Sequence, residues 1–166
     1  MKTYALIHLG GICALLLAGC ASRSITMSSV GPDTLAYDPA SLHDTGYLKV
    51  YSDTRCRVLG DGPPYYTHTG YNIYELSGKR IKYVRNHIGD MDQSPASVKI
   101  AAGKYNVVAQ SSSYGRVTVP VVVKPGRTTE LHLDRSWRLP PDTDTNSVVC
   151  LPNGEAVGWR DYMAKQ

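Results

Sequence analysis

Histidine is a residue type that can bind a metal ion or act as an acid–base group. The chain has five histidines, and His68 and His87 lie in segments that could approach each other if their strands pair. No HxxE or HExxH spacing occurs, so no two ligands are placed together by one helix. We expect surface or hydrogen-bonded histidines and no metal. A metal-binding or metal-dependent hydrolase module that uses His68 and His87 is the alternative.

Serine could supply a nucleophile, but no serine lies in the Gly-x-Ser-x-Gly turn that exposes one. The run at 111–113 is better explained as a polar turn between two strands. We therefore predict no catalytic residue, no cofactor and no enzymatic activity.

Tyrosines near a long loop are candidates for binding. Tyr65, Tyr66 and Tyr71 lie in or beside residues 61–71, together with His68. Exposed tyrosines can stack on sugar rings or anchor a protein interface, whereas buried ones would roof the core. If they are exposed, these four residues form the predicted contact surface for a protein or glycan.

A basic run at 79–85 is the second candidate surface. Strand alternation places Arg80 and Lys82 on one face and Arg85 on the other, so the run does not form one patch. These cations either protect an edge strand or contact an anionic polymer or lipid phosphate in a salt-sensitive way. The net charge of +4 is too small to indicate nucleic acid as a partner.

The first twenty residues carry a further chemistry. An apolar run begins behind Lys2 and ends in small residues, Ala18 and Gly19, followed by Cys20. It is too short and interrupted to span a bilayer and has the proportions of a secretory signal. A thiol at this place can form the thioether to a diacylglyceryl group.

This segment resembles the lipobox of bacterial lipoproteins. The resemblance implies that residues 1–19 are a signal peptide and that Cys20 becomes the acylated N-terminus, held at a membrane by two or more chains. Ala21 follows, and no Asp stands there as an inner-membrane retention signal, which implies the outer membrane, at its periplasmic or surface face. An ordinary cleaved signal or an uncleaved apolar anchor is the alternative.

Cysteine counting then leaves one pair. Cys13 is removed with the signal and Cys20 is lipidated, so Cys56 and Cys150 remain in an oxidising compartment. We predict a disulfide between them, which would close a loop of about 94 residues and contribute roughly 4–5 kcal/mol at most. Two buried free thiols are the alternative.

The element pattern is that of an all-β protein. Residues 20–45 are rich in Ser, Pro and Asp, and are predicted to be a lipidated flexible tether. From 46 to 134 the sequence alternates in short segments separated by turn signals, which predicts an antiparallel β-sandwich of about seven strands. The strands are expected at 47–51, 71–76, 80–85, 97–101, 104–110, 116–123 and 128–134.

The last 32 residues, 135–166, are predicted to be an extension with a β-hairpin. Asn153-Gly154 stands between two apolar runs, and Asn-Gly is typical of a tight hairpin turn.

Two segments carry a family resemblance. Residues 102–107, with Gly103, Tyr105 and Val107, and residues 124–133, with a Pro-Gly turn, resemble the end of a carboxypeptidase regulatory-like domain. This fold is similar to transthyretin and to PEGA-type surface repeats, and its resemblance covers roughly 46–134. It implies a prealbumin-like or immunoglobulin-like sandwich without catalytic activity. The expected function is therefore a lipid-anchored binding or structural module of the cell envelope, with a protein or glycan partner.

Overall fold

The structure, a computed structural model, describes residues 27–32, 44–89 and 91–161. The predicted signal peptide and Cys20 lie outside the described residues. No helix in the described part is long and apolar enough to cross a membrane. Its single helical element is a 3₁₀ turn, η1 (Thr145–Ser147).

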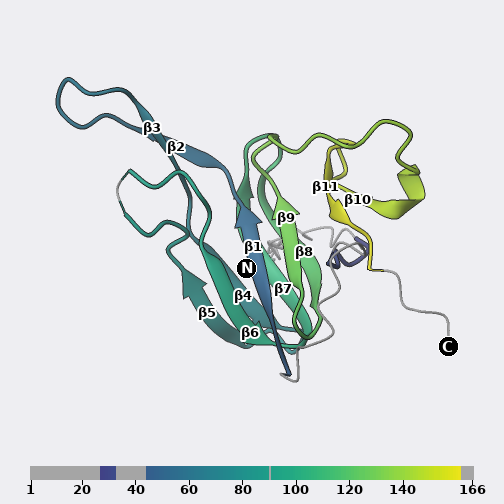
Figure 1. The fold of residues 1–166 in the computed structure, drawn as a ribbon. Coiled ribbons are helices and arrows are strands. Elements are labelled where there is room, and N and C mark those ends of the chain that lie inside the picture. The colour runs from purple at the N-terminus through teal and green to yellow at the C-terminus, as the bar shows by residue number, and fades with distance from the viewer. Residues whose placement is uncertain (1–26, 33–43, 90, 162–166) are drawn as a thin grey trace, which may run out of the picture.

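Two sheets form the sandwich that the alternation predicts, so the all-β fold class is confirmed (Figure 1). The four-stranded sheet has the order β5-β4-β7-β8, with β5 (Arg80–Val84), β4 (Tyr71–Glu75), β7 (Gly103–Ser111) and β8 (Gly115–Val123). The three-stranded sheet has the order β6-β1-β9, with β6 (Ser97–Ala101), β1 (Thr45–Tyr51) and β9 (Thr128–His132).

The core lies between the two sheets, because alternate residues of each strand face inward. Leu48 and Val50 of β1 are fully buried, as are Val107 of β7 and Val119 of β8. Their neighbours in sequence point outward. Neither sheet alone could remove this apolar surface from water, so the sandwich depends on both.

One strand pairing differs from the antiparallel expectation. β1 pairs with β6 in the antiparallel sense but with β9 in the parallel sense, with Val50 opposite Leu131. The turn at 124–127 does not close a hairpin between β8 and β9; it carries the chain from one sheet to the other. The chain therefore enters the second sheet in the same direction as β1.

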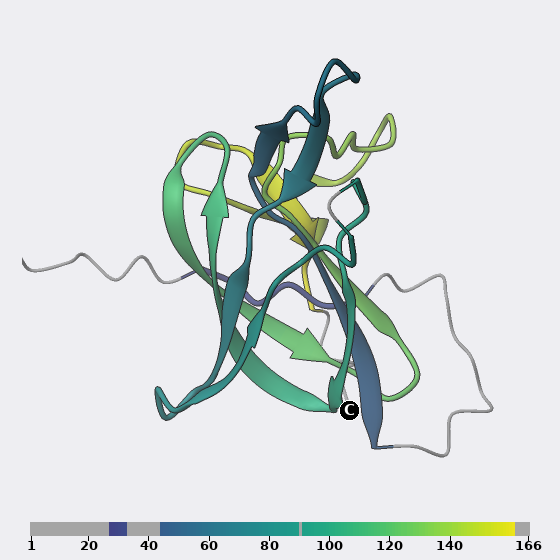
Figure 2. The same cartoon turned by 90° about the vertical axis from the view of Figure 1, so that its left-hand side faces the viewer.

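The segment between β1 and β4, expected to be a long loop, contains a separate two-stranded hairpin. We call it the finger: β2 (Thr54–Arg57), β3 (Tyr65–His68) and the turn between them. It projects beyond the sandwich, at the upper left of Figure 1 and the top of Figure 2.

The predicted C-terminal hairpin is confirmed. β10 (Val148–Cys150) pairs antiparallel with β11 (Ala156–Trp159). Val149 and Val157 are buried against the core of the sandwich, which fixes the hairpin on its side.

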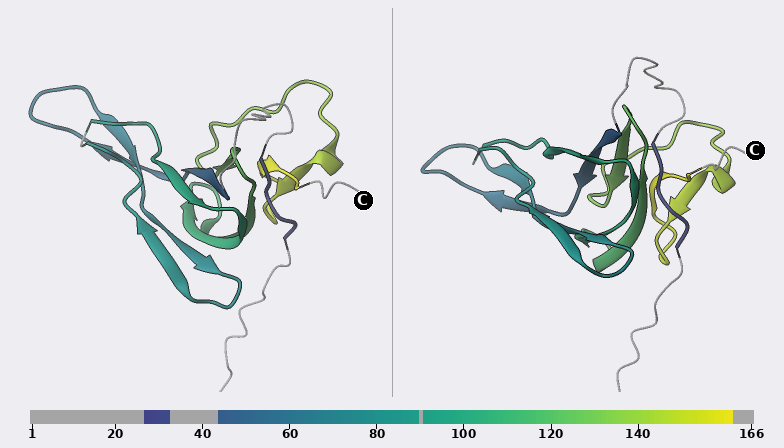
Figure 3. Two further views of the ribbon diagram at one scale, coloured as in Figure 1. Left: turned by 60° about the horizontal axis from the view of Figure 1, so that its bottom comes forward. Right: turned by 90° about the horizontal axis from the view of Figure 1, so that it is seen from below.

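Residues 27–32, which we call the strap, differ from the flexible tether predicted for 20–45, because these six residues are docked on the sandwich. Val30 is fully buried. Its N–H donates to Pro120 (2.9 Å), and its carbonyl accepts from Val122 (2.8 Å). On the other side, the Gly31 N–H donates to Trp159 (2.8 Å). The strap therefore joins β8 to β11, and views from below show it beside the C-terminal hairpin (Figure 3).

Close packing around the strap requires glycine at two positions. A Cβ at Gly158 would lie 2.5 Å from a Val30 methyl, and one at Gly31 would lie 2.8 Å from the Asp161 Cα. An ion pair between Lys124 and Asp161 (2.7 Å) closes the same region. One buried valine in a segment of six residues gives no periodic pattern. The polar composition of 20–45 therefore did not indicate that part of it is docked on the sandwich.

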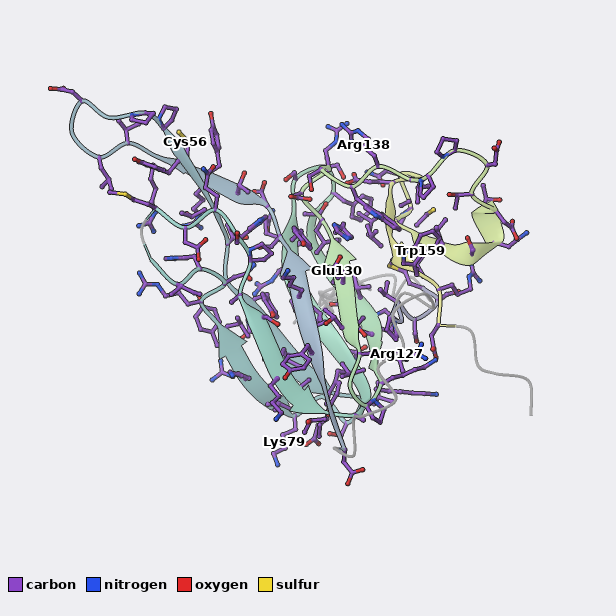
Figure 4. The ribbon with its side chains drawn as sticks, viewed as in Figure 1. Cys56, Lys79, Arg127, Glu130, Arg138 and Trp159 are labelled. Carbon is purple, nitrogen blue, oxygen red and sulfur yellow. The ribbon has the colours of Figure 1, made fainter. Side chains whose placement is uncertain are left out.

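The predicted Cys56–Cys150 disulfide is absent from the structure. Both side chains are free and exposed. Cys56 belongs to the finger and Cys150 to the hairpin of Trp159, and these elements lie on opposite sides of the sandwich (Figure 4). A disulfide needs Cα atoms within about 7 Å, which this arrangement does not provide.

Candidate binding groove

The four residues of the predicted contact surface do not share one environment. Tyr66 is exposed (50 %) and Tyr65 is half-buried, both on the finger. Tyr71 is 1 % exposed and belongs to the core, so its placement on a contact surface is wrong. Burial raises the pKa of its phenol well above the usual range. It alternates with Ile73, which faces inward for the same reason.

His68 is also buried (5 % exposed) and serves the finger's base. Its Nδ1 lies 2.6 Å from the carbonyl oxygen of Ser52, and the Ser52 hydroxyl donates to the Thr69 carbonyl (2.6 Å). Asn86 completes this cluster. Its amide donates to Val50, Ser52 and Thr69, and its Oδ1 accepts from Ala96.

Asn86 is suited to this place because it has a positive φ of 68°. Asparagine adopts left-handed backbone more readily than most side chains do. Since it is 1 % exposed and hydrogen-bonded on both sides of its amide, it fixes where the finger leaves the sandwich.

The other predicted cations lie elsewhere. Arg80 and Lys82 are exposed on β5, the edge strand of the four-stranded sheet, next to an irregularity in its pairing with β4. Neither lines the groove described below. Charged side chains and an irregular edge both discourage pairing with another chain. The position of Arg80 and Lys82 therefore favours protection of the edge strand over contact with an anionic polymer or lipid phosphate.

A groove of about 620 Å³ lies between the finger and the outer face of the four-stranded sheet. Four arginines line it, and Asp53 is its single acidic residue. We call it the arginine groove; its cations are Arg55, Arg57, Arg85 and Arg116.

Strand register explains why cations from distant parts of the sequence meet here. Gln110 pairs with Arg116 across β7 and β8. Tyr71 pairs with Val84 of β5, so the preceding residue, Gly70, is level with Arg85. Asn72 pairs with Val108 of β7, which places Gly70 level with Gln110 as well. Arg85, Gly70, Gln110 and Arg116 therefore form one row across the outer face.

Gly70 leaves room in this row for the side chain of Tyr83. A Cβ there would lie 2.2 Å from the Tyr83 hydroxyl, so only glycine allows this ring to lie across it. Tyr83, Asn72 and Val108 form the next row, and all three line the groove. Above them, Arg55 and Arg57 lie two positions apart on β2, so they share a face of the finger.

The groove favours anions. Arg55 and Arg116 are exposed, and neither side chain forms a hydrogen bond or ion pair within the part of the chain that the structure describes. The Asp53 carboxylate accepts a hydrogen bond from Ser112 (2.6 Å). Guanidinium groups bind carboxylates and phosphates through paired, charge-assisted hydrogen bonds.

His68 and His87 both line this groove, but they do not form a metal centre with acids or cysteines. Among the described residues, no three His, Cys, Asp or Glu side chains gather closely enough to hold a metal ion. His87 instead bonds to Arg85 (3.3 Å) and Gly89 (3.1 Å), and His68 is held by Ser52.

A second hollow of about 760 Å³ lies between the β7–β8 turn, the β10–β11 turn and residues 135–139. Two of its lining residues, His132 and Trp137, belong to an aromatic column. His132 stacks between Tyr51 (4.4 Å) and Trp137 (4.9 Å), and Trp137 meets the ring of Trp159 edge-on (5.5 Å). The column fixes the chain after β9 against the C-terminal hairpin.

Glu130 adjoins this column. Its carboxylate lies 3.6 Å from the His132 Nε2. This interaction holds the pKa of Glu130 below its usual value, with Lys49 contributing less, against the opposing effect of burial.

The groove was missed by sequence reasoning because its residues are not adjacent in sequence. Arg55 and Arg57 alternate visibly, and that spacing could have been noticed. The alternation correctly placed Arg85 on the opposite face from Arg80 and Lys82. That Arg116 lies in the same row as Arg85 follows only from the register of four strands. In comparisons with protein-family models, curated proteins and solved structures, the chain matches none.

Proposed function

We propose that the protein is a lipid-anchored, non-enzymatic module of the cell envelope that binds a protein or glycan partner through the finger and the arginine groove. The observation that carries the binding part is the groove itself, where four arginines from three separate segments converge beside a projecting hairpin. Folding does not require this arrangement, because exposed cations gain nothing from being near one another.

The finger supports the same proposal. Its turn exposes Val58 (59 %) and Leu59 (45 %), and Tyr66 is half exposed on β3. Apolar side chains grouped on a projecting element are typical of a contact surface. The partner therefore meets apolar residues at the tip and cations at the base.

The location part of the proposal rests on the N-terminal sequence alone. Acylation at Cys20 would make the outer membrane a permanent partner, and the resemblance to carboxypeptidase regulatory-like domains remains part of this proposal. Metabolic labelling with a palmitate analogue is expected to label the wild-type protein and leave Cys20→Ala unlabelled. Equal labelling of both would contradict the anchor.

The binding part is tested in intact cells by placing a photo-crosslinking amino acid at Tyr66. The expected result is a discrete adduct that is weakened when Arg55 and Arg116 are both changed to Glu. The matched control changes Lys79 and Lys99 to Glu, which alters the charge equally but away from the groove. A probe placed on β6 serves as the positional control. If the probe at Tyr66 gives no adduct, or only the adducts that the β6 probe also gives, the finger is not a contact surface.

A further inference from the structure

We infer that the arginine groove binds an acidic polysaccharide, a glycan with repeated carboxylate groups. This inference rests on the proposed function and narrows its partner to one chemical class. Three features of the groove carry it: the distance between its cations, the nature of its other side chains and the shape of its floor.

The distance between the cations indicates a ligand with several charges. Arg85 directly follows β5 and Arg116 lies on β8, and these are the two outer strands of the sheet. Because the two residues stand in one row, their backbones are separated by three strand spacings, about 14 Å. Arg55 and Arg57 add two cations on the finger side. A single carboxylate or phosphate cannot contact all four, whereas a chain with charges at intervals can.

The remaining lining indicates a sugar. Between the arginines lie planar amides and a hydroxyl group, which exchange hydrogen bonds with sugar hydroxyls in both directions. They are supplied by Asn72, Gln110 and Tyr83. Val108 and Ala109 are the aliphatic side chains in the lining, and Ala109 is buried. The groove therefore lacks the apolar recesses that would take the side chains of a peptide or the tail of a lipid.

The floor suits a ring lying flat. Gly70 has no side chain, and the exposed Tyr83 ring (58 %) lies across it. An aromatic ring beside planar amides can pack against the apolar face of a sugar while the amides contact its hydroxyls.

The test measures binding of the full-length protein, in non-ionic detergent, to three probes: polygalacturonate, neutral dextran and poly-L-glutamate. We expect binding to polygalacturonate, weaker binding to poly-L-glutamate and none to dextran. Affinity should fall as ionic strength rises from roughly 0.05 to roughly 0.3 M. Poly-L-glutamate binding as tightly as polygalacturonate would overturn the glycan and indicate an acidic protein segment.

Variants then locate the site. Changing Arg55 and Arg116 together to Gln is expected to weaken polygalacturonate binding about tenfold or more, since it removes two charge-assisted contacts to the carboxylates of the ligand. The same charge change at Lys79 and Lys99 should leave affinity unchanged. Both arginines are exposed, so thermal unfolding of the variant should match wild type.

Equal weakening by the two double variants would overturn the groove as the site, and so would an unaffected arginine variant. Failure of the glycan is distinguishable from failure of the binding module. If polygalacturonate does not bind while the Tyr66 adduct in cells still depends on Arg55 and Arg116, the inference is wrong and the proposed function stands.

Discussion

Replacing Asn86 by Ala should cost a large part of the stability of a small domain. The two N–H groups of the Asn86 amide are shared among the acceptors Val50, Ser52 and Thr69, and its Oδ1 accepts from Ala96. This amounts to three hydrogen bonds, whose loss at about 1 kcal/mol each costs about 3 kcal/mol. Alanine also tolerates the left-handed backbone less well, which adds about 1 kcal/mol. We therefore expect Asn86→Ala to lower the free energy of unfolding by about 4 kcal/mol.

Urea unfolding followed by tyrosine and tryptophan fluorescence measures this change. Asn106→Ala is the matched control, because Asn106 is half-buried on the outer face of β7 and no hydrogen bond of its side chain is seen within the described residues. It should change stability by less than about 0.5 kcal/mol. A cost below about 1 kcal/mol for Asn86→Ala, or one equal to the control, would refute the view that this side chain fixes the finger's base.

Three further predictions follow from features of the fold. Val30→Ala should lower the free energy of unfolding by about 2 kcal/mol in the same assay, because it leaves a cavity between β8 and β11; an unchanged midpoint would mean that the strap is not docked. Alkylation of the denatured protein without reductant should modify both Cys56 and Cys150, and a cross-linked peptide pair would contradict the structure. Because the Glu130 pKa is lowered on folding, its charge stabilises the protein above the ordinary glutamate pKa of about 4.3, and this contribution is lost as pH falls through the lowered value. In Glu130→Gln, the free energy of unfolding should therefore fall less steeply at acid pH than in the wild type. The same fall in both proteins would contradict this prediction.

The strands could be predicted from sequence wherever alternation was clean. In 116–123 the inward residues are Val at every second position, and in 128–133 Leu131 and Leu133 alternate with polar residues. These segments correspond to β8 and β9. The C-terminal hairpin was predictable because Asn153-Gly154 sets its turn locally. Such signals need no knowledge of the rest of the chain.

What could not be predicted depends on contacts between distant segments. β2 has the sequence Thr-Arg-Cys-Arg, with no apolar face, so its pairing with β3 left no periodic signal. The parallel partner of β1 was not encoded in any turn. The groove could not be predicted either, since its arginines come together only when the finger and the four-stranded sheet are in place.

The strap also has a mechanical meaning. Val30 follows Cys20 by ten residues, and ten residues reach about 35 Å at most, so an anchor at Cys20 would hold the sandwich close to the bilayer. Tension on that anchor would run along the strap and load its hydrogen bonds to Pro120, Val122 and Trp159 together, in shear. The rate of forced unfolding would then be set at this seam, where the first described segment joins β8 to the last described segment of the chain.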